Sequence, residues 1–212
     1  MIAIVDYGAG NQTSVRRALD HLGIPCVITA DPDTLLRAAG VIFPGVGAAG
    51  QAMSRLRAEG LDRALRDVVD RGIPLLGVCL GCQILTAHSE EDDGTVMLGL
   101  APGDCRRFGR EAREEDGVLI RVPHMGWNRL RDRRPTPLFA GIPEDAQFYF
   151  VHSYYVSTTA DLTLASCRYG IDFCAAYGRD GLWAVQFHPE KSGPPGLRLL
   201  RNFVDCCGDR SC

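Results

Sequence analysis

The sequence predicts an α/β protein: an open, mostly parallel sheet with helices on both faces, followed by a strand-rich and partly antiparallel second half. Over the first 80 residues, short continuous apolar runs alternate with helical patterns, which is typical of parallel strands buried on both faces. From about residue 103 the segments are of β type. The chain has 212 residues, 46% of them hydrophobic, enough for one substantial core. We therefore expect a single domain over 1–212.

The first half contains four expected strands separated by helical segments. The strands are the apolar runs 2–5, 26–29, 41–43 and 73–78. Asn11 is a suitable cap for a helix in which Val15 and Leu19 share one face. A short helix is expected at 34–39 after an Asp-Pro cap, and further helical patterns continue up to Arg71.

The second half is expected to form five strands and one helix. The strands are expected at 117–122, 148–156, 162–168, 173–177 and 182–187, and the helix from about 195 to 206. The charged run 110–116 is most simply a solvated turn between two strands. The end of the chain, about 207–212, is expected to be frayed.

Composition excludes several classes of protein. The 23 Lys and Arg are scattered among 26 Asp and Glu, and the net charge of -3 provides no basic field for nucleic acid. The apolar run 2–5 is too short for a signal peptide, and the run 73–80 is too short to span a bilayer. Nine cysteines, an odd number without an export signal, do not suggest a disulfide framework. We expect a cytoplasmic protein that binds neither nucleic acid nor membrane.

Residues 77–81, Gly-Val-Cys-Leu-Gly, have the pattern of a nucleophile elbow, a sharp turn between a strand and a helix. Glycines two positions before and after Cys79 relieve the clashes that such a strained turn creates. Free N–H groups at the start of the following helix favour a thiolate, and that of Leu80 would help to bind an oxyanion. Cys79 is therefore the candidate nucleophile.

Two other interpretations of Cys79 remain open from the elbow alone. A buried cysteine is commonly only a small apolar side chain, and this chain has nine cysteines. Cys79 and Cys82 also form a C-x-x-C sequence at the start of a helix after a strand, which is the placement of a thioredoxin-like dithiol. The elbow thus allows a nucleophile, a redox pair or a structural cysteine.

A late His-Pro-Glu sequence supplies a candidate base. Pro189 favours an extended conformation at His188, so the side chains of His188 and Glu190 point to the same side. Glu190 can then orient the imidazole ring. Together with Cys79 these residues have the logic of a catalytic triad in which cysteine takes the place of serine.

Glycine-rich turns follow two of the expected strands. The N–H groups of Gly45, Val46 and Gly47 lie at the same sheet edge as Cys79 and would contribute to an oxyanion hole. The turn at 8–10 is a poor match to a dinucleotide fingerprint, because position 13 is Thr rather than Gly. The cysteines and histidines lack a second pair at zinc spacing, so we expect no metal and no cofactor.

These motifs together resemble the triad-type class I glutamine amidotransferases, whose hallmarks are a G-x-C-x-G elbow followed by Gln and a late H-P-E. Within that family the chain is similar to the glutaminase subunits of imidazole glycerol phosphate synthases. The similarity covers nearly the whole chain and is carried by residues 6–11, 44–47, 123–128, 149–154 and 188–192. The H-M-G-W-N and H-P-E-K-S sequences are the ones most particular to this subunit.

The resemblance implies a class I glutamine amidotransferase-like fold and glutaminase activity. Cys79 would attack the side-chain amide of L-glutamine, His188 would pass a proton to the leaving ammonia, and water would release glutamate from the thioester. The ammonia would go to a (β/α)8-barrel cyclase, the partner in a heterodimer. That step of histidine biosynthesis yields imidazole glycerol phosphate and an aminoimidazole carboxamide ribonucleotide.

The resemblance also assigns roles by position. The residues expected to hold glutamine are Gly47, Gln83, Glu91, Ser153 and Tyr154. The residues expected at the cyclase interface are Asn11, Met125, Trp127, Asn128, Tyr149 and Lys191. The alternative interpretation of the interface set is ordinary aromatic core residues and surface charge.

One departure and three rival functions need stating. Cys82 stands where methionine is common in these subunits, and we interpret it as a packing substitution. The rivals are a glutaminase subunit for another synthase, a thiol–disulfide oxidoreductase and a catalytically inactive binding subunit. The oxidoreductase offers no role for Glu190, and the complete set of Cys79, His188 and Glu190 argues against an inactive subunit.

Overall fold

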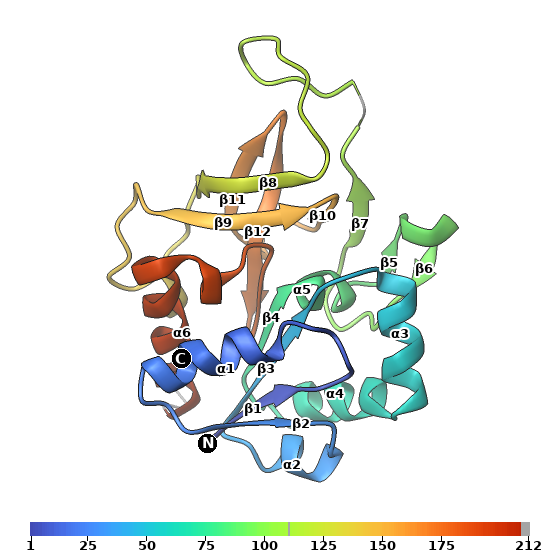
Figure 1. Cartoon of the computed structure of the whole chain (residues 1–212), viewed down its shortest axis with the longest axis vertical. Coiled ribbons are helices and arrows are strands. Elements are labelled where there is room, and N and C mark those ends of the chain that lie inside the picture. The colour runs from blue at the N-terminus through green and yellow to red at the C-terminus, as the bar shows by residue number, and fades with distance from the viewer. Residues whose placement is uncertain (110, 209–212) are drawn as a thin grey trace.

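A mixed sheet of eleven strands organises the computed structural model, which describes residues 1–109 and 111–208 (Figure 1). In spatial order its strands are β2 (Cys26–Thr29), β1 (Ile2–Val5), β3 (Gly40–Gly45), β4 (Leu75–Cys79), β13 (Leu182–Val185), β12 (Ile171–Arg179), β10 (Tyr154–Ser157), β7 (Asp104–Arg107), β5 (His88–Ser89) and β6 (Thr95–Val96). Strand β11 (Thr163–Tyr169) pairs with β12. A separate antiparallel pair consists of β8 (His124–Arg129) and β9 (Gln147–His152).

The two halves of this sheet differ in direction. Strands β2, β1, β3, β4 and β13 pair in parallel. Strands β13, β12, β10 and β7 pair in antiparallel fashion. The predicted fold class, a mostly parallel sheet followed by a partly antiparallel strand-rich half, is confirmed.

Helices cover both faces of the parallel half (Figure 1). One face carries α1 (Gln12–His21) and α6 (Gly193–Gly208), and the other carries α2 (Pro32–Leu36), α3 (Ala49–Ala58), α4 (Leu61–Asp70) and α5 (Leu80–Ile84). The described part of the chain also has 3-10 turns at Glu91–Asp93, Pro137–Phe139 and Pro189–Lys191. Alternate residues of β1 enter two separate cores: Ile2 and Ile4 pack with α1 and α6, whereas Ala3 and Val5 pack with α3 and α4. The continuous apolar runs therefore reflect burial on both faces.

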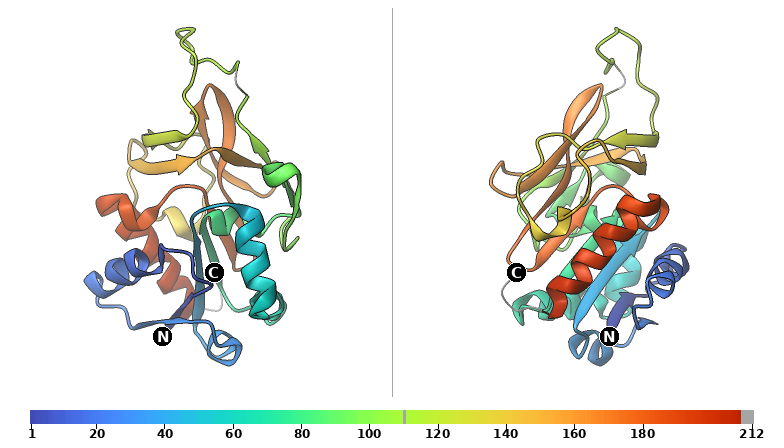
Figure 2. Two further views of the ribbon diagram at one scale, coloured as in Figure 1. Left: turned by 45° about the vertical axis from the view of Figure 1, so that its right-hand side comes forward. Right: turned by 90° about the vertical axis from the view of Figure 1, so that its left-hand side faces the viewer.

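The second half departs from the prediction in several elements. The expected strand 117–122 is wrong, because this segment has one isolated bridge, Arg113 to Leu119, and lies in a projecting loop (Figure 2). A strand forms instead at 124–129. The expected strand 148–156 breaks at Ser153, because β9 pairs with β8 whereas β10 pairs with β7 and β12. The short strands β5, β6 and β7 were not predicted.

The helix boundaries also differ from expectation. The helix expected at 34–39 begins at Pro32 and ends at Leu36. Helix α6 continues through Gly208, so the frayed end expected from about 207 is wrong for Cys207 and Gly208. The remaining residues of that prediction, 209–212, and Arg110 of the charged run lie outside the described residues. No helix within the described ranges is long and apolar enough to cross a membrane.

Candidate active site

Cys79 lies at the carboxyl end of β4, directly before the first residue of α5. Its backbone has φ 55° and ψ -111°, a strained conformation for a residue with a side chain. A Cβ atom on Gly77 would lie 2.6 Å from Leu85 Cδ1, and one on Gly81 would lie 1.8 Å from the carbonyl oxygen of Phe43. The elbow therefore needs both glycines because β3 and α5 approach it closely.

We expect Gly81→Ala to destabilise the protein by about 3 kcal/mol, because the added methyl group would displace a backbone carbonyl of β3. For a chain of this size that is a loss of roughly 6–12 °C in melting temperature. Gly208→Ala is the control, since its Cβ would meet no atom within 4 Å. Equal melting temperatures for the two variants would contradict the packing argument.

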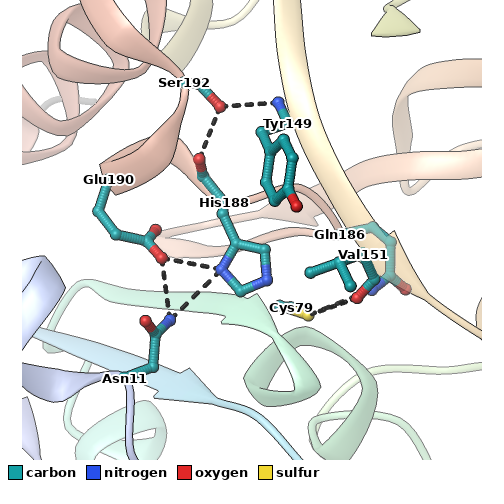
Figure 3. A network of polar contacts seen from close by, with 8 residues as sticks. All are labelled: Asn11, Cys79, Tyr149, Val151, Gln186, His188, Glu190 and Ser192. Carbon is teal, nitrogen blue, oxygen red and sulfur yellow. Dashed lines mark hydrogen bonds and ion pairs between the residues drawn. The ribbon is translucent and has the colours of Figure 1, made fainter. Parts of the chain in front are cut away.

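His188 lies between the end of β13 and the turn Pro189–Lys191, and its side chain is fully buried. Its Nδ1 atom is 2.8 Å from Oε1 of Glu190 (Figure 3). Because a carboxylate can only accept, Nδ1 carries the proton and donates to Glu190. The other ring nitrogen, Nε2, has no hydrogen-bond partner within the described residues. This tautomer leaves Nε2 available for proton exchange with a substrate.

Asn11 contacts the same carboxylate oxygen as His188. Its Nδ2 atom donates to Glu190 Oε1 at 2.9 Å and lies 3.3 Å from His188 Nδ1. The last contact joins two donors, so the hydrogen bonds are those to Glu190. Asn11 occupies the N-cap position of α1, but its side chain makes no capping hydrogen bond. The predicted capping role is therefore wrong, and the amide orients the His188–Glu190 pair instead.

The backbone of β9 fixes the main chain of His188. The N–H of His188 donates to the Tyr149 carbonyl at 2.9 Å. Ser192 Oγ donates to the His188 carbonyl at 2.6 Å and accepts from the Tyr149 N–H at 3.0 Å. Figure 3 shows the Tyr149 ring beside the imidazole, with centroids 6.5 Å apart. His188 is thus tied to β9, the strand paired with β8.

The imidazole of His188 favours its charged form. Burial lowers the pKa of His188, but the negative charge of the Cys79 thiolate and of Glu190 outweighs it and raises the pKa to about 10. An imidazolium facing a thiolate is the state in which cysteine is nucleophilic and a proton is ready for a leaving group.

We expect Cys79→Ala to lower the pKa of His188, because the largest cause that raises it is then removed while burial remains. Ring ¹⁵N shifts followed against pH measure this pKa. Since the imidazolium form is lost as the pH rises through the pKa, the variant should deprotonate at lower pH than the wild type. Cys82→Met is the control and should leave the titration unchanged. An unchanged pKa in Cys79→Ala would show that Cys79 does not act on the imidazole.

A cavity of about 300 Å³ opens in front of Cys79. The sequence-predicted residues at its wall are Val46, Gly47, Cys79, Leu80, Gln83, Glu91, Ser153 and Tyr154. Those predicted residues are far apart in the sequence and are brought together here by the turn after β3, the elbow between β4 and α5, the 3-10 turn at Glu91 and the junction between β9 and β10. A volume of this size suits a small amino acid.

Two polar side chains of this cavity have fixed positions. Gln83 Nε2 donates to the Tyr154 carbonyl at 2.8 Å and to Gln186 Oε1 at 3.0 Å. Glu91 Oε2 accepts from the Ala49 N–H at 2.7 Å, and burial raises the pKa of Glu91. The bond from the first residue of α3 thus fixes the Glu91 carboxyl group near the cavity.

The glycine turn after β3 borders the cavity beside Cys79. A Cβ on Gly45 would lie 2.2 Å from Tyr7 Oη and 2.9 Å from Leu80 Cβ, so no side chain fits there. Gly47 has φ 98°, a conformation that favours glycine, and open space around it. Val46 between them is 39% exposed. Gly45 therefore has no room for a side chain, whereas Gly47 has open space around it and a backbone conformation that favours glycine.

Sequence reasoning missed two groups that contact the Cys79 sulfur. The Val151 carbonyl lies 3.8 Å from Sγ, and Gln186 Nε2 lies 3.9 Å from it. Gln186 was read only as part of a strand, although it lies two residues before His188. Its polar side chain in an apolar strand next to H-P-E was the available signal.

The residues expected at the interface differ in exposure. Met125 and Trp127 are 62% and 53% exposed on one face of β8, and Lys191 is also exposed. Tyr149 is half-buried and pairs with Trp127 across β8 and β9. The half-buried Asn128 donates to the Arg168 carbonyl at 2.9 Å, on the opposite face. Asn11 is buried.

The rival dithiol has little support in the geometry. Cys79 and Cys82 are both free thiols. Cys82 is fully buried, and burial raises its pKa well above the ordinary value. A thiol that stays protonated is a poor partner in disulfide exchange.

Within residues 1–109 and 111–208, no three His, Cys, Asp or Glu side chains are grouped as metal ligands.

Comparisons with known proteins agree with this geometry. The family model for class I glutamine amidotransferases matches residues 3–206. The chain is 63% identical over 207 residues to the imidazole glycerol phosphate synthase subunit HisH of Nitratidesulfovibrio vulgaris strain DP4, covering 98% of this chain and 97% of the relative. This chain belongs to the HisH family of class I glutamine amidotransferases. The resemblance inferred from the motifs is confirmed, and the chain is an enzyme subunit.

More distant relatives and solved structures agree. HisH of Moorella thermoacetica is 48% identical over 203 residues, with 95% of this chain and 93% of the relative covered. A crystal structure described as a glutamine amidotransferase superposes with a TM-score of 0.74 at 22% identity, covering 98% of this chain and all of that chain. PurLQS from Thermotoga maritima gives a TM-score of 0.69 at 18% identity, covering 96% and 97%. At these identities the two structures establish the fold alone.

Proposed function

We propose that this chain hydrolyses L-glutamine to glutamate and ammonia through Cys79, His188 and Glu190, and delivers the ammonia to a (β/α)8-barrel cyclase. The observation that carries the proposal is the cavity of about 300 Å³, which has Cys79 in its wall. The pKa of His188, raised by Cys79 and Glu190, favours an imidazolium that can give a proton to a leaving group. Gln83, Glu91, Ser153, Tyr154 and Gly47 are proposed to hold the substrate.

The reaction follows from these positions. The Cys79 thiolate attacks the side-chain amide carbon of glutamine, and the oxyanion is stabilised by N–H groups of Leu80 and of residues 45–47. His188 Nε2 gives its proton to the leaving nitrogen, so ammonia departs and a glutamyl thioester remains. His188 then takes a proton from water, which attacks the thioester. Glutamate leaves and the thiolate and imidazolium are restored. Glu190, held by Asn11, stabilises the imidazolium throughout.

The proposed partner rests on the relatives, which are named as subunits of imidazole glycerol phosphate synthase. By this likeness the products of the cyclase are imidazole glycerol phosphate and an aminoimidazole carboxamide ribonucleotide. We propose a heterodimer of two chains in the cytoplasm, with 1–212 acting as one glutamine amidotransferase domain. Exposed Met125 and Trp127 on β8, with Lys191 nearby in sequence to His188, support an interface beside the active site.

Glutamine hydrolysis by the chain with and without candidate barrel partners tests the proposal. We expect hydrolysis that depends on the partner and synthesis that uses glutamine as the nitrogen source. Insulin reduction is the parallel assay for the dithiol rival. Reduction of insulin without glutaminase activity under any condition would overturn the proposal, and activity with another synthase would replace the partner.

We expect Trp127→Ala to weaken binding of the barrel at least about thirtyfold and Lys191→Ala to weaken it less. A large aromatic anchor commonly contributes about 2 kcal/mol or more to binding, whereas an exposed charge contributes about 1 kcal/mol or less. Partner affinity and melting temperature are measured together. Arg71→Ala, on an exposed residue after α4, is the matched control for Lys191. Normal binding with early melting would place Trp127 and Lys191 in the fold rather than the interface.

A further inference from the structure

Two buried histidines outside the proposed triad lie at the glutamine cavity: His152 is part of its wall, and His124 is bonded to His152. His124 begins β8 and His152 ends β9, and the two residues are paired across the strands. Nδ1 of His124 lies 3.0 Å from Nε2 of His152. The His124 ring is stacked between Phe150 and Tyr169, with centroids 4.9 and 4.0 Å away. The pair is thus held in a closed aromatic environment.

The hydrogen bonds at the two ends of the pair fix every proton in it. His152 Nδ1 lies 2.8 Å from the Tyr154 carbonyl oxygen, which only accepts, so Nδ1 carries the proton. Burial lowers the pKa of both rings, so both are neutral and His152 Nε2 is an acceptor. His124 must then donate from Nδ1, which leaves its Nε2 as an acceptor.

Asn128 supplies a hydrogen-bond donor for His124 Nε2 at the other end of the pair. Its Oδ1 accepts from the Arg129 N–H at 2.8 Å, and its Nδ2 donates to the Arg168 carbonyl at 2.9 Å. Nδ2 also lies 3.4 Å from His124 Nε2, toward which its second hydrogen can point. The bonds therefore run in one direction, from Asn128 through His124 and His152 to the Tyr154 carbonyl.

The Tyr154 carbonyl lies where the chain leaves the small sheet and enters the large one. Ser153, between β9 and β10, belongs to neither strand, and its carbonyl accepts from the Phe108 N–H at 3.2 Å. Residues 151–154 and Gln83 all line the cavity. Gln83 Nε2 also donates to the Tyr154 carbonyl, so this oxygen accepts from both His152 and Gln83. These two bonds fix the Tyr154 carbonyl beside the cavity.

We infer that His152 is a positioning residue for glutamine binding and that His124 orients it. The inference rests on the proposed glutaminase function. By holding the Tyr154 carbonyl, His152 keeps Ser153 and Tyr154 where they meet the amino and carboxylate ends of the substrate. These ends are remote from the amide that reacts. Loss of the bond from His152 to the Tyr154 carbonyl therefore weakens binding of substrate and transition state alike, which raises KM and leaves kcat unchanged.

A matched pair of amide variants separates the two bonds of His152. The side-chain amide nitrogen of Asn takes the place of the Nδ1 donor, so His152→Asn is expected to keep the bond to the Tyr154 carbonyl and to lose that to His124. The side-chain amide oxygen of Gln takes the place of the Nε2 acceptor, so His152→Gln is expected to keep the bond from His124 and to lose that to Tyr154. With the barrel partner bound, we expect KM for glutamine to rise about three- to tenfold in His152→Gln. We expect a smaller rise of KM in His152→Asn than in His152→Gln, with kcat similar in both.

Equal KM values in the two variants, or an effect confined to kcat, would overturn the inference. A merely structural role would reduce melting temperature and the active fraction without a difference in KM. Ring ¹⁵N shifts of the wild-type chain give a second readout. We expect the neutral tautomer with the proton on Nδ1 for both His124 and His152, and a proton on Nε2 in either ring would also overturn it. Failure of the proposed function would instead appear as no glutamine turnover by the wild-type complex, with the tautomers as expected.

Discussion

Cys79→Ala is expected to abolish glutamine hydrolysis while leaving synthesis by the assembled pair intact when ammonia is supplied. The thioester cannot form without the sulfur, whereas the cyclase needs only ammonia. Loss of a nucleophile that acts as a unit with its base commonly costs about 10⁴-fold or more in kcat. The two activities are measured on the same complex, with glutamine or an ammonium salt as the nitrogen source.

Cys82→Met is the matched control for this substitution. Cys82 is buried in the core with α5, away from the cavity wall, and Met fills apolar gaps of similar kind. We expect its glutaminase activity to stay close to that of the wild type. A large loss of glutaminase activity in Cys82→Met would support the alternative in which Cys79 and Cys82 form a redox-active dithiol. Retained glutaminase activity in Cys79→Ala would falsify the mechanism, and loss of the ammonia-dependent reaction would indicate a broken complex.

The parallel half of the fold was predictable because its signals are local. Strands buried on both faces are apolar throughout, so the runs at 2–5 and 41–43 stand out between helical patterns, and the half-buried edge strand 26–29 is also mostly apolar. The elbow was equally visible, because its G-x-C-x-G pattern is local. The reason for the two glycines, the close approach of Leu85 to Gly77 and of the Phe43 carbonyl to Gly81, is seen only in the fold.

The antiparallel half was harder to predict because its strands are defined by their partners. Nothing local marks Ser153 as the point where the chain changes sheets. Strand β8 was missed because its inward face carries His124, Gly126 and Asn128, whose burial is compensated by hydrogen bonds and ring stacking. The apolar Val118 and Leu119 suggested a strand but are 60% and 45% exposed.

In the candidate site, too, local sequence signals predicted some residues and missed those that depend on long-range contacts. The three predicted triad residues lie together because His188 and Glu190 are two residues apart where the chain leaves β13, and Cys79 ends the neighbouring strand β4. Asn11 is different, since its bond to Glu190 spans 179 positions in the sequence. A polar residue at the start of a helix has an obvious local use as a cap. Only the fold shows that its side chain is used at the active site.

The isolated chain is expected to be a poor glutaminase that becomes active when the barrel and its nucleotide ligand are bound. A lone subunit that hydrolysed glutamine freely would waste it and release ammonia, and the family resemblance implies such latency. We propose the turn after β3 as the element that changes. Gly47 has φ 98° and open space around it, and Val46 is 39% exposed, so the Val46 peptide can rotate with little steric cost.

Rotation of that peptide would decide whether the Val46 N–H points at the oxyanion or away from it. One oxyanion donor typically contributes about 10²–10³ in rate, which sets the activation expected from a single rotation. We would measure kcat for the chain alone, with the barrel, and with barrel plus nucleotide. Gly47→Ala strains the positive φ and should reduce the activated kcat more than the basal one, whereas the control Gly10→Ala meets no atom within 4 Å. Equal kcat in all three states would refute latency. A change confined to KM would indicate that the partner acts on glutamine binding, for which we infer a role of His152, rather than on the oxyanion hole.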